Sequence, residues 1–303
     1  MFNKILLPLD GSQLAEAAVP YVRNLADQLG SEIYLVHVCP PEHQQYVHMH
    51  QIYMNSLVDG MKTLLKSNKT IKIEAEVVVG DPLKSLFDYS RLKNIDLIAL
   101  TTHGNQGFKP WSLGDVADKI VRGSGIPTLL IRLKNAKDLE PRKTTIENIL
   151  APVDNSDASK AALPFAIDLA TKTKAKITLF SMAQTAYAQS MDSSGAGLGI
   201  NWDAVDKASV QAAADYLKTL TEDLKKQGVE AGNISLLGFD AAYEILEQEK
   251  KGNFDLVVMA TRGRSSVARW AFGSVAEKVL REGNLPILLI KEKGAKERQA
   301  EAK

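Results

Sequence analysis

The sequence lacks the features that would place it outside the ordinary soluble globular proteins. It has one cysteine, Cys39, so no disulfide bond can form within the chain and the fold does not depend on oxidation. Its 303 residues carry a formal net charge of only +1, and we therefore expect no recruitment by nucleic acid or by an anionic membrane. No apolar run approaches the roughly 18 residues that a membrane-spanning helix needs, and the apolar start of the chain is too short for a signal peptide. These absences predict a cytoplasmic protein.

The sequence also lacks the common catalytic signatures. It has no GxxxxGKS/T phosphate-binding loop, and we find no nucleophile, histidine and acid that can be placed in one site. Histidine, the commonest general base, does not occur after His103. We therefore predict no catalytic residues.

What the sequence does contain is an internal repeat. The matching segments are residues 3–38 with 147–182 at an offset of 144, and residues 95–104 with 254–263 and 125–132 with 284–291 at an offset of 159. The growth of the offset indicates an insertion in the second copy, which we place at residues 188–202. Two copies of about 150 residues are each large enough to bury a core of their own.

The repeat predicts the domain organisation. We expect a first domain at residues 1–135, a polar linker at 136–145, a second domain at 146–292 and a flexible tail at 293–303. The linker is charged and contains a proline, and the tail has no apolar residue other than alanine.

Each copy alternates short, uninterrupted apolar runs with amphipathic helical patterns. Uninterrupted runs are typical of strands buried on both faces of a parallel sheet. In the first copy we expect these strands at residues 4–9, 32–38, 74–79, 96–100 and 127–131. The alternation predicts two tandem α/β domains, each a doubly wound, five-stranded parallel sheet of the Rossmann-like type. Pro20 and Pro164 fall inside the first helical pattern of each copy and predict a kink or a late helix start there.

Two strand-to-helix turns in each copy carry candidate binding residues. The first turn has the pattern Pro-x-Asp-x-Ser, with Asp10 in the first copy and Asp154 in the second. The second turn holds two glycines with nine residues between them, Gly104 and Gly114 in one copy and Gly263 and Gly273 in the other. Ligands of doubly wound sheets bind beyond the carboxyl ends of strands, where these turns lie. For the aspartates, a plain turn residue before a helix is the alternative interpretation.

The residue after the last glycine distinguishes the two copies. Ser274 opens a helix whose free N–H groups form a seat for phosphate, although Ser274 with Glu277 also fits a purely structural capping box. The first copy has Asp115 there, a good N-cap whose carboxylate would repel a phosphate. Like charges about 4 Å apart repel by roughly 1 kcal/mol in water and about 4 kcal/mol at an effective dielectric of 20. The second copy is therefore the better candidate for a phosphate.

On these residues the sequence resembles a tandem universal stress protein, over nearly the full length of both repeats. The nucleotide signature of that family is Gly, two residues, Gly, nine residues, Gly, then Ser or Thr. The second copy keeps Gly263, Gly273 and Ser274 but has Ala260 for the first glycine. The first copy keeps both later glycines but has Thr101 for the first glycine and Asp115 for the hydroxyl residue.

The resemblance implies an adenine-nucleotide site in the second domain, with ATP, alone or with Mg²⁺ or Mn²⁺, as the ligand. The implied contacts are Pro152, Val153, Asp154 and Met182 around the base, Met259 and Ala260 near base and ribose, and Arg262, Gly263, Gly273, Ser274 and Val275 around the phosphates. The corresponding first-domain candidates, of second rank, are Asp10, Val38, Thr101, Gly104 and Gly114.

The predicted function is that of a stress-response regulatory protein that binds ATP or another adenine nucleotide and hydrolyses it slowly at most. One alternative is an interaction or dimerisation module that binds no nucleotide, which the departures from the signature favour. Another is an adenylyl-transferring α/β enzyme, whose motifs we do not find. We expect neither nucleic acid nor a membrane as a partner.

Two further expectations concern assembly and metal. The resemblance implies that the last strands, at residues 128–131 and 287–290, pair edge to edge within the chain as a pseudo-dimer, with a homodimer as a further assembly. His43, His48 and His50 follow the second strand together with Cys39, but their spacing matches no standard zinc pattern. We interpret this segment as a mobile polar loop and predict no metal site.

Overall fold

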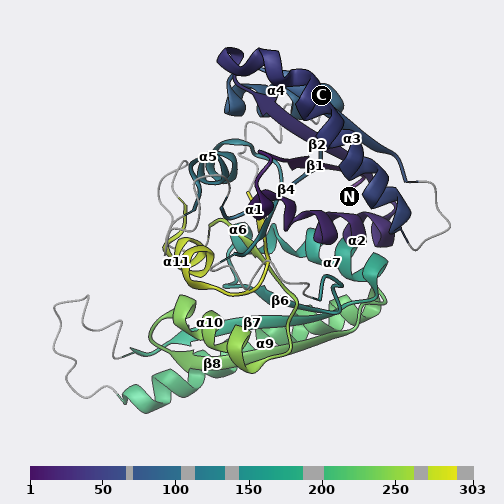
Figure 1. Cartoon of the computed structure of the whole chain (residues 1–303). Helices are drawn as coiled ribbons and strands as arrows, with labels where there is room; N and C mark the ends of the chain where they lie inside the picture. The colour runs from purple at the N-terminus through teal and green to yellow at the C-terminus, as the bar shows by residue number, and fades with distance from the viewer. Residues whose placement is uncertain (66–70, 104–112, 134–142, 187–200, 263–271, 292–303) are drawn as a thin grey trace, which may run out of the picture. The chain divides into compact units, whose positions relative to one another are not determined.

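The computed structural model describes residues 1–65, 71–103, 113–133, 143–186, 201–262 and 272–291. The chain divides into two compact units (Figure 1): Met1–Ile146 with Leu285–Lys303, and Glu147–Asn284. Most of the expected insertion at 188–202, most of the expected linker and all of the expected tail lie outside the described residues. None of the helices that the structure describes is long and apolar enough to cross a membrane.

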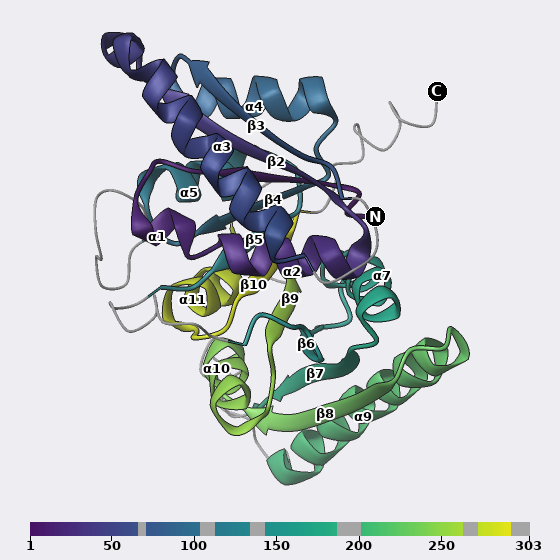
Figure 2. The ribbon, with the colours of Figure 1, turned by 45° about the vertical axis from the view of Figure 1, so that its right-hand side comes forward.

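The first unit is a doubly wound α/β fold. Its elements are β1 (Lys4–Pro8), α1 (Gln13–Glu16), α2 (Val19–Leu29), β2 (Glu32–Cys39), the 3₁₀ helix η1 (Pro41–Tyr46), α3 (Val47–Thr63), β3 (Ile73–Val79), α4 (Pro82–Lys93), β4 (Leu97–Thr101), α5 (Asp115–Gly123), β5 (Thr128–Ile131) and, from the end of the chain, β10 (Ile287–Ile290). The order β3-β2-β1-β4-β5 is parallel throughout. Helices α2 and α3 cover one face of this sheet, and α4 and α5, which contact each other, cover the opposite face (Figure 2).

The second unit repeats this plan. Its described elements are β6 (Asn148–Pro152), α6 (Asp157–Lys160), α7 (Leu163–Thr173), β7 (Lys176–Gln184), α9 (Trp202–Lys226), β8 (Ala231–Gly238), α10 (Ala241–Lys251), β9 (Leu256–Ala260) and α11 (Ser274–Glu282). The order β8-β7-β6-β9 is again parallel. The prediction of tandem doubly wound α/β domains with mostly parallel sheets is therefore confirmed.

The fifth strand of the second repeat lies in the first unit. Strand β10 pairs antiparallel with β5, with Leu288 opposite Leu129 and Ile287 opposite Leu130. Every residue of both strands is buried. The predicted edge-to-edge pairing of residues 128–131 with 287–290 is therefore present, and it covers the apolar edge that β5 would otherwise expose.

Local sequence explains where the first helices of each repeat begin. Helix α2 begins at Val19 with Pro20 in its first turn, and α7 begins at Leu163 with Pro164 in the same place. Proline is tolerated there because the first N–H groups of a helix have no partner within the helix. Of the two outcomes expected for these prolines, the late helix start is the one that occurs.

Candidate functional site

The second unit has a cavity of about 500 Å³ beyond the carboxyl ends of β6, β7 and β9. Ten of the eleven second-domain candidates line it: Pro152, Val153, Asp154, Met182, Met259, Ala260, Arg262, Gly273, Ser274 and Val275. The eleventh, Gly263, lies outside the described residues. Both strand-to-helix turns of the repeat thus contribute to one cavity, although about 120 residues of sequence separate them.

Sequence reasoning missed the wall of this cavity that α9 supplies. Ser209, Ala212, Ala213 and Tyr216 line it from that helix, and Ala241 and Ile245 line it from α10. The four α9 residues follow the helical spacing i, i+3, i+4 and i+7, so they lie on one face of the helix. That spacing, with three small residues and one aromatic residue, was the sequence pattern that could have predicted this wall of the cavity.

The first turn of each unit has the same hydrogen bonding. Asp154 Oδ1 accepts the Ser156 N–H at 3.1 Å and the Ser156 hydroxyl at 2.6 Å. In the first unit, Asp10 Oδ1 accepts the same two groups of Ser12 at 3.0 and 2.6 Å. The intervening residue is left-handed in both turns, with φ of 63° at Asn155 and 82° at Gly11. Both aspartates are therefore turn residues, and both also line a cavity.

The second turn differs from the expected capping box. Gly273 is the N-cap of α11, Ser274 is its first helical residue, and no side-chain hydrogen bond caps this helix within the described part of the chain. Glu277 pairs with Arg281 instead of returning to the start of the helix. The capping-box interpretation is therefore wrong. The same holds for Asp115 as an N-cap, because Gly114 takes that place in α5.

The backbone explains why glycine precedes both helices. Gly273 N–H donates to Thr261 O at 2.8 Å, and Gly114 N–H donates to Thr102 O at the same distance. A Cβ on Gly114 would lie 3.3 Å from that carbonyl oxygen, which is tighter than ordinary van der Waals contact. The turn is held against the end of the fourth strand, and this sets the position of the helix N-terminus.

The first unit has a larger cavity, of about 1150 Å³. Four of the five first-domain candidates line it, Asp10, Val38, Thr101 and Gly114, whereas Gly104 lies outside the described residues. Asp115 lines it as well. The domain with the less complete nucleotide signature therefore has the roomier cavity.

Aromatic side chains that sequence reasoning did not assign to a site line this first cavity. His37, His43, Tyr46, His50 and Tyr53 belong to it, and they come from β2, η1 and α3. The interpretation of residues 43–50 as a mobile loop is wrong, because His43 lies in η1 and His48 and His50 lie in α3. The buried residues Met54, Val58 and Met61 of α3 recur at helical spacing and were the overlooked signal.

His37 and His50 form a stacked pair. Their ring centroids are 4.1 Å apart and the ring planes differ by 23°. His37 is 6% exposed, and its Nδ1 lies 2.9 Å from the Leu9 carbonyl oxygen. Burial, reinforced by the neighbouring His50, lowers the pKa of His37 below its ordinary value. Within the described residues, no three His, Cys, Asp or Glu side chains are grouped so as to hold a metal ion.

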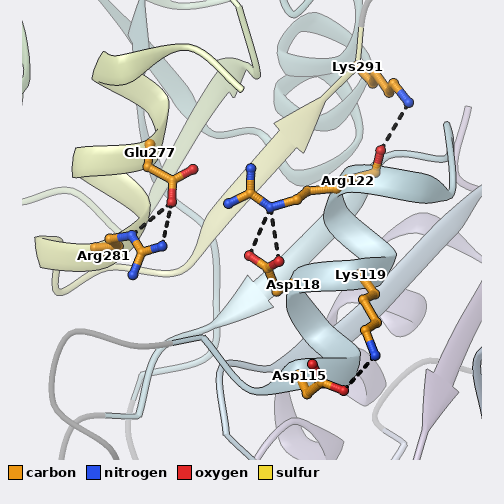
Figure 3. A network of polar contacts seen from close by, with 7 residues as sticks. All are labelled: Asp115, Asp118, Lys119, Arg122, Glu277, Arg281 and Lys291. Carbon is orange, nitrogen blue, oxygen red and sulfur yellow. Dashed lines mark hydrogen bonds and ion pairs between the residues drawn. The ribbon is translucent and has the colours of Figure 1, made fainter. Parts of the chain in front are cut away.

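The charge at Asp115 is partly offset by a lysine. Lys119 Nζ lies 2.7 Å from Asp115 Oδ2, one turn along α5 (Figure 3). In the second unit the corresponding Lys278 pairs with Asp240 at 2.6 Å. The Lys119–Asp115 pair is half exposed, so solvent screens it and much of the carboxylate's repulsion toward a phosphate remains.

The chain has clear relatives. The sequence model of the universal stress protein family matches residues 1–132 and again residues 145–291. Universal stress protein Rv2623 of Mycobacterium tuberculosis is 22% identical over 301 residues, which cover 95% of this chain and 96% of that protein. Universal stress protein MJ0531 of Methanocaldococcus jannaschii is 27% identical over 44% of this chain and 83% of its own length.

Solved structures agree on the fold. The crystal structure of a universal stress protein from Archaeoglobus fulgidus superposes with a TM-score of 0.70 at 21% identity, over 97% of this chain and 100% of that one. At this identity the likeness concerns the fold alone. The two matches to the family model, which together span most of the sequence, concern the family. This chain therefore belongs to the universal stress protein family and contains two of its domains in tandem.

Proposed function

We propose that this chain is a regulatory protein of the stress response that binds ATP, or another adenine nucleotide, in its second domain. The observation that supports this most is the joint lining of one cavity by Asp154 at the first turn and by Arg262, Gly273 and Ser274 at the second. A nucleotide needs an apolar slot and a phosphate seat at opposite ends of one site, and these two turns offer them.

At the base end, the lining is apolar with one acceptor. Val153 and Met259 are buried and Met182 is half-buried, so together they offer an apolar surface to a purine ring. Asp154 is the carboxylate that would accept a hydrogen bond from an exocyclic amino group or a ribose hydroxyl. Ala260 is 4% exposed, so the methyl group that replaces the signature glycine packs largely within the protein.

At the phosphate end, the groups are donors. The first N–H groups of α11 lack a side-chain cap among the described residues, so they are available to an anion. The Ser274 hydroxyl adds a donor and Arg262 adds a positive charge. A Mg²⁺ or Mn²⁺ ion would bind together with the phosphates. The protein would contribute the donors that hold the phosphates themselves.

The lining of this cavity favours binding over turnover. Its titratable side chains, within the described residues, are Asp154, Tyr216 and Arg262, and histidine does not occur in this repeat. No group therefore stands out as a general base for an attacking water. We propose hydrolysis far below about 1 s⁻¹, the low end of ordinary enzymes. The two alternative functions, a nucleotide-free interaction module and an adenylyl-transferring enzyme, are supported by no observation of this kind.

The first experiment measures nucleotide directly. Protein purified from cells is denatured and the released adenine nucleotide is quantified by chromatography, followed by calorimetric titration of the nucleotide-free chain with ATP. We expect one site, weakened tenfold to a thousandfold in Ser274→Asp, because a carboxylate about 4 Å from a phosphate costs roughly 1–4 kcal/mol. Ser274→Ala, which removes only the hydroxyl, is the matched control and should have a much smaller effect. No binding at millimolar ATP would favour the interaction module.

A further inference from the structure

The two cavities differ most in their charge. Among the described lining residues, the second-domain cavity has the carboxylate of Asp154 and the guanidinium of Arg262. The first-domain cavity has the carboxylates of Asp10 and Asp115, and neither Lys nor Arg appears in the described part of its lining. The two carboxylates come from the turns that correspond to those lining the cavity of the second domain. The described lining of the first cavity is therefore unsuited to a polyphosphate.

The buried histidine of the first cavity, His37, does not reverse this balance. His37 is buried and its Nδ1–H donates to the Leu9 carbonyl, which leaves the lone pair on Nε2. Its lowered pKa keeps the ring neutral at pH 7. Lys119 offsets part of the Asp115 charge, but it is 52% exposed and is not among the residues that line the cavity. Among the described lining residues, the fixed charges are therefore those of the two carboxylates.

The same cavity is rich in aromatic faces. His37 and His50 present a stacked pair, and Tyr46 of η1 and Tyr53 of α3 also line the cavity. Tyr46 and Met49 are 45% and 65% exposed, so part of this apolar lining is open to solvent. Aromatic faces attract cations through the ring quadrupole, and desolvation strengthens this attraction. Carboxylates combined with aromatic walls are a chemistry that recognises ammonium groups.

We propose that the cavity of the first domain is a second ligand site, which binds an organic cation: a protonated amine carried on an aromatic ring. Asp115 attracts the ammonium group, Asp10 adds negative charge to the lining, and the tyrosines and the histidine pair receive the ring. The volume of about 1150 Å³ accommodates such a ligand readily. This site is independent of the proposed nucleotide site, so the tandem chain would respond to two chemically different ligands.

The test uses three indoles of nearly equal shape and different charge: tryptamine (+1), tryptophol (0) and indole-3-acetate (−1). All five histidines lie in the first domain, so their ring proton resonances report on that domain alone in the full-length chain. His37, His43, His50 and His103 line the cavity, whereas His48 does not and is the internal control. We expect tryptamine to shift the four lining resonances and to bind at least tenfold more tightly than indole-3-acetate, with tryptophol between them.

Two exposed positions on one turn of α5 provide variants that should leave the fold intact. Asp115→Asn should weaken tryptamine binding about fivefold, and Lys119→Met should strengthen it. Each variant removes one charge beside the cavity, and the interaction of one such charge with the ammonium group is worth roughly 1 kcal/mol in water. Equal affinity for the three indoles, tighter binding of the acid, or no shift of the lining resonances at millimolar tryptamine would overturn the proposal. So would ATP, if it shifted these resonances at lower concentration than tryptamine. Calorimetric ATP binding that Ser274→Asp abolishes reports on the second domain separately.

Discussion

Lys278 Nζ lies 2.6 Å from Oδ2 of Asp240, so an ion pair joins α11 to the N-cap of α10 in the second domain. Burial opposes the ionisation of Asp240. The lysine and the Tyr243 and Ala242 N–H groups outweigh this effect and hold the pKa of the carboxyl below its usual value. The first domain has Asp81 and Lys119 at the corresponding positions, but Lys119 pairs with Asp115 instead. Asp115, which departs from the nucleotide signature, thus pairs with the lysine whose counterpart in the second domain pairs with the N-cap of α10.

Asp240 should contribute to stability with a defined pH dependence. Its lowered folded pKa means that the contribution is present above the unfolded pKa and is lost as pH falls through the folded pKa. Asn keeps the cap, so Asp240→Asn should cost less than about 1 kcal/mol at pH 7 for this partly exposed pair, and Asp240→Ala about 1 kcal/mol more. Urea unfolding at pH 7 and pH 3 measures both. An Asp240→Asn penalty that persisted unchanged at pH 3 would show that the ion pair is not its source.

His37 should make the first domain sensitive to acid. Because its folded pKa is lowered, the unfolded chain binds the proton more readily, and stability rises with pH. The contribution is complete above the unfolded pKa near 6.5 and declines as pH falls through 6.5 and then through the folded pKa. Thermal unfolding between pH 8 and pH 5 should show a steeper fall in the wild type than in His37→Ser, which introduces the residue of the corresponding position, Ser181.

The slope, not the absolute Tm, is the informative quantity for His37, because Ser leaves a cavity that lowers stability at every pH. The exposed His48 is the matched control. If His48→Ser reduced the slope as much as His37→Ser, burial of His37 would not be the cause.

Leu288 should stabilise the first unit although it belongs to the second repeat. It is 2% exposed and opposite Leu129 in the β5–β10 pair. Leu288→Ala should therefore destabilise the first unit by about 2–5 kcal/mol, the usual range for a buried leucine. The histidine resonances measure this in urea, since all of them come from the first domain. Leu217→Ala, which removes a fully buried α9 side chain of the second unit, is the control and should change the histidine transition much less. Equal shifts in the two variants would contradict the assignment of β10 to the first unit.

Replacing Asp115 by serine, the hydroxyl residue of the second repeat, should change the affinities of the first cavity for tryptamine and for ATP in opposite directions. In Asp115→Ser, a carboxylate is lost and Lys119 loses its partner, so the site gains net positive charge. We expect tryptamine to bind more weakly and ATP to bind more strongly than in the wild type, by calorimetry with the Ser274→Asp background to silence the second domain. Unchanged affinity for both ligands would mean that charge at this turn does not select the ligand.

Much of the architecture was predictable because it depends on short-range patterns. The buried apolar runs at β1, β2, β3, β4 and β5 and the helix starts at Pro20 and Pro164 follow from periodicity and backbone chemistry within about ten residues. The repeat follows from comparing the sequence with itself. The candidates at the two turns were predictable too, because parallel strands bring their carboxyl ends to one edge of the sheet. For the same reason, the ten described candidates of the second domain line one cavity.

The sequence by itself thus determined the duplication, the strand-and-helix plan and the chemistry of the turns. Only the tertiary structure decided three further points. Ser274 is the first helical residue and not the cap, because the Thr261 carbonyl holds Gly273 in the capping place. Helix α3 brings His50 onto His37 in the cavity of the first domain. Strand β10, the last strand of the second repeat, belongs to the compact unit of the first repeat, where it pairs with β5 and covers its apolar edge. Each of these points depends on contacts between segments that local sequence patterns do not connect.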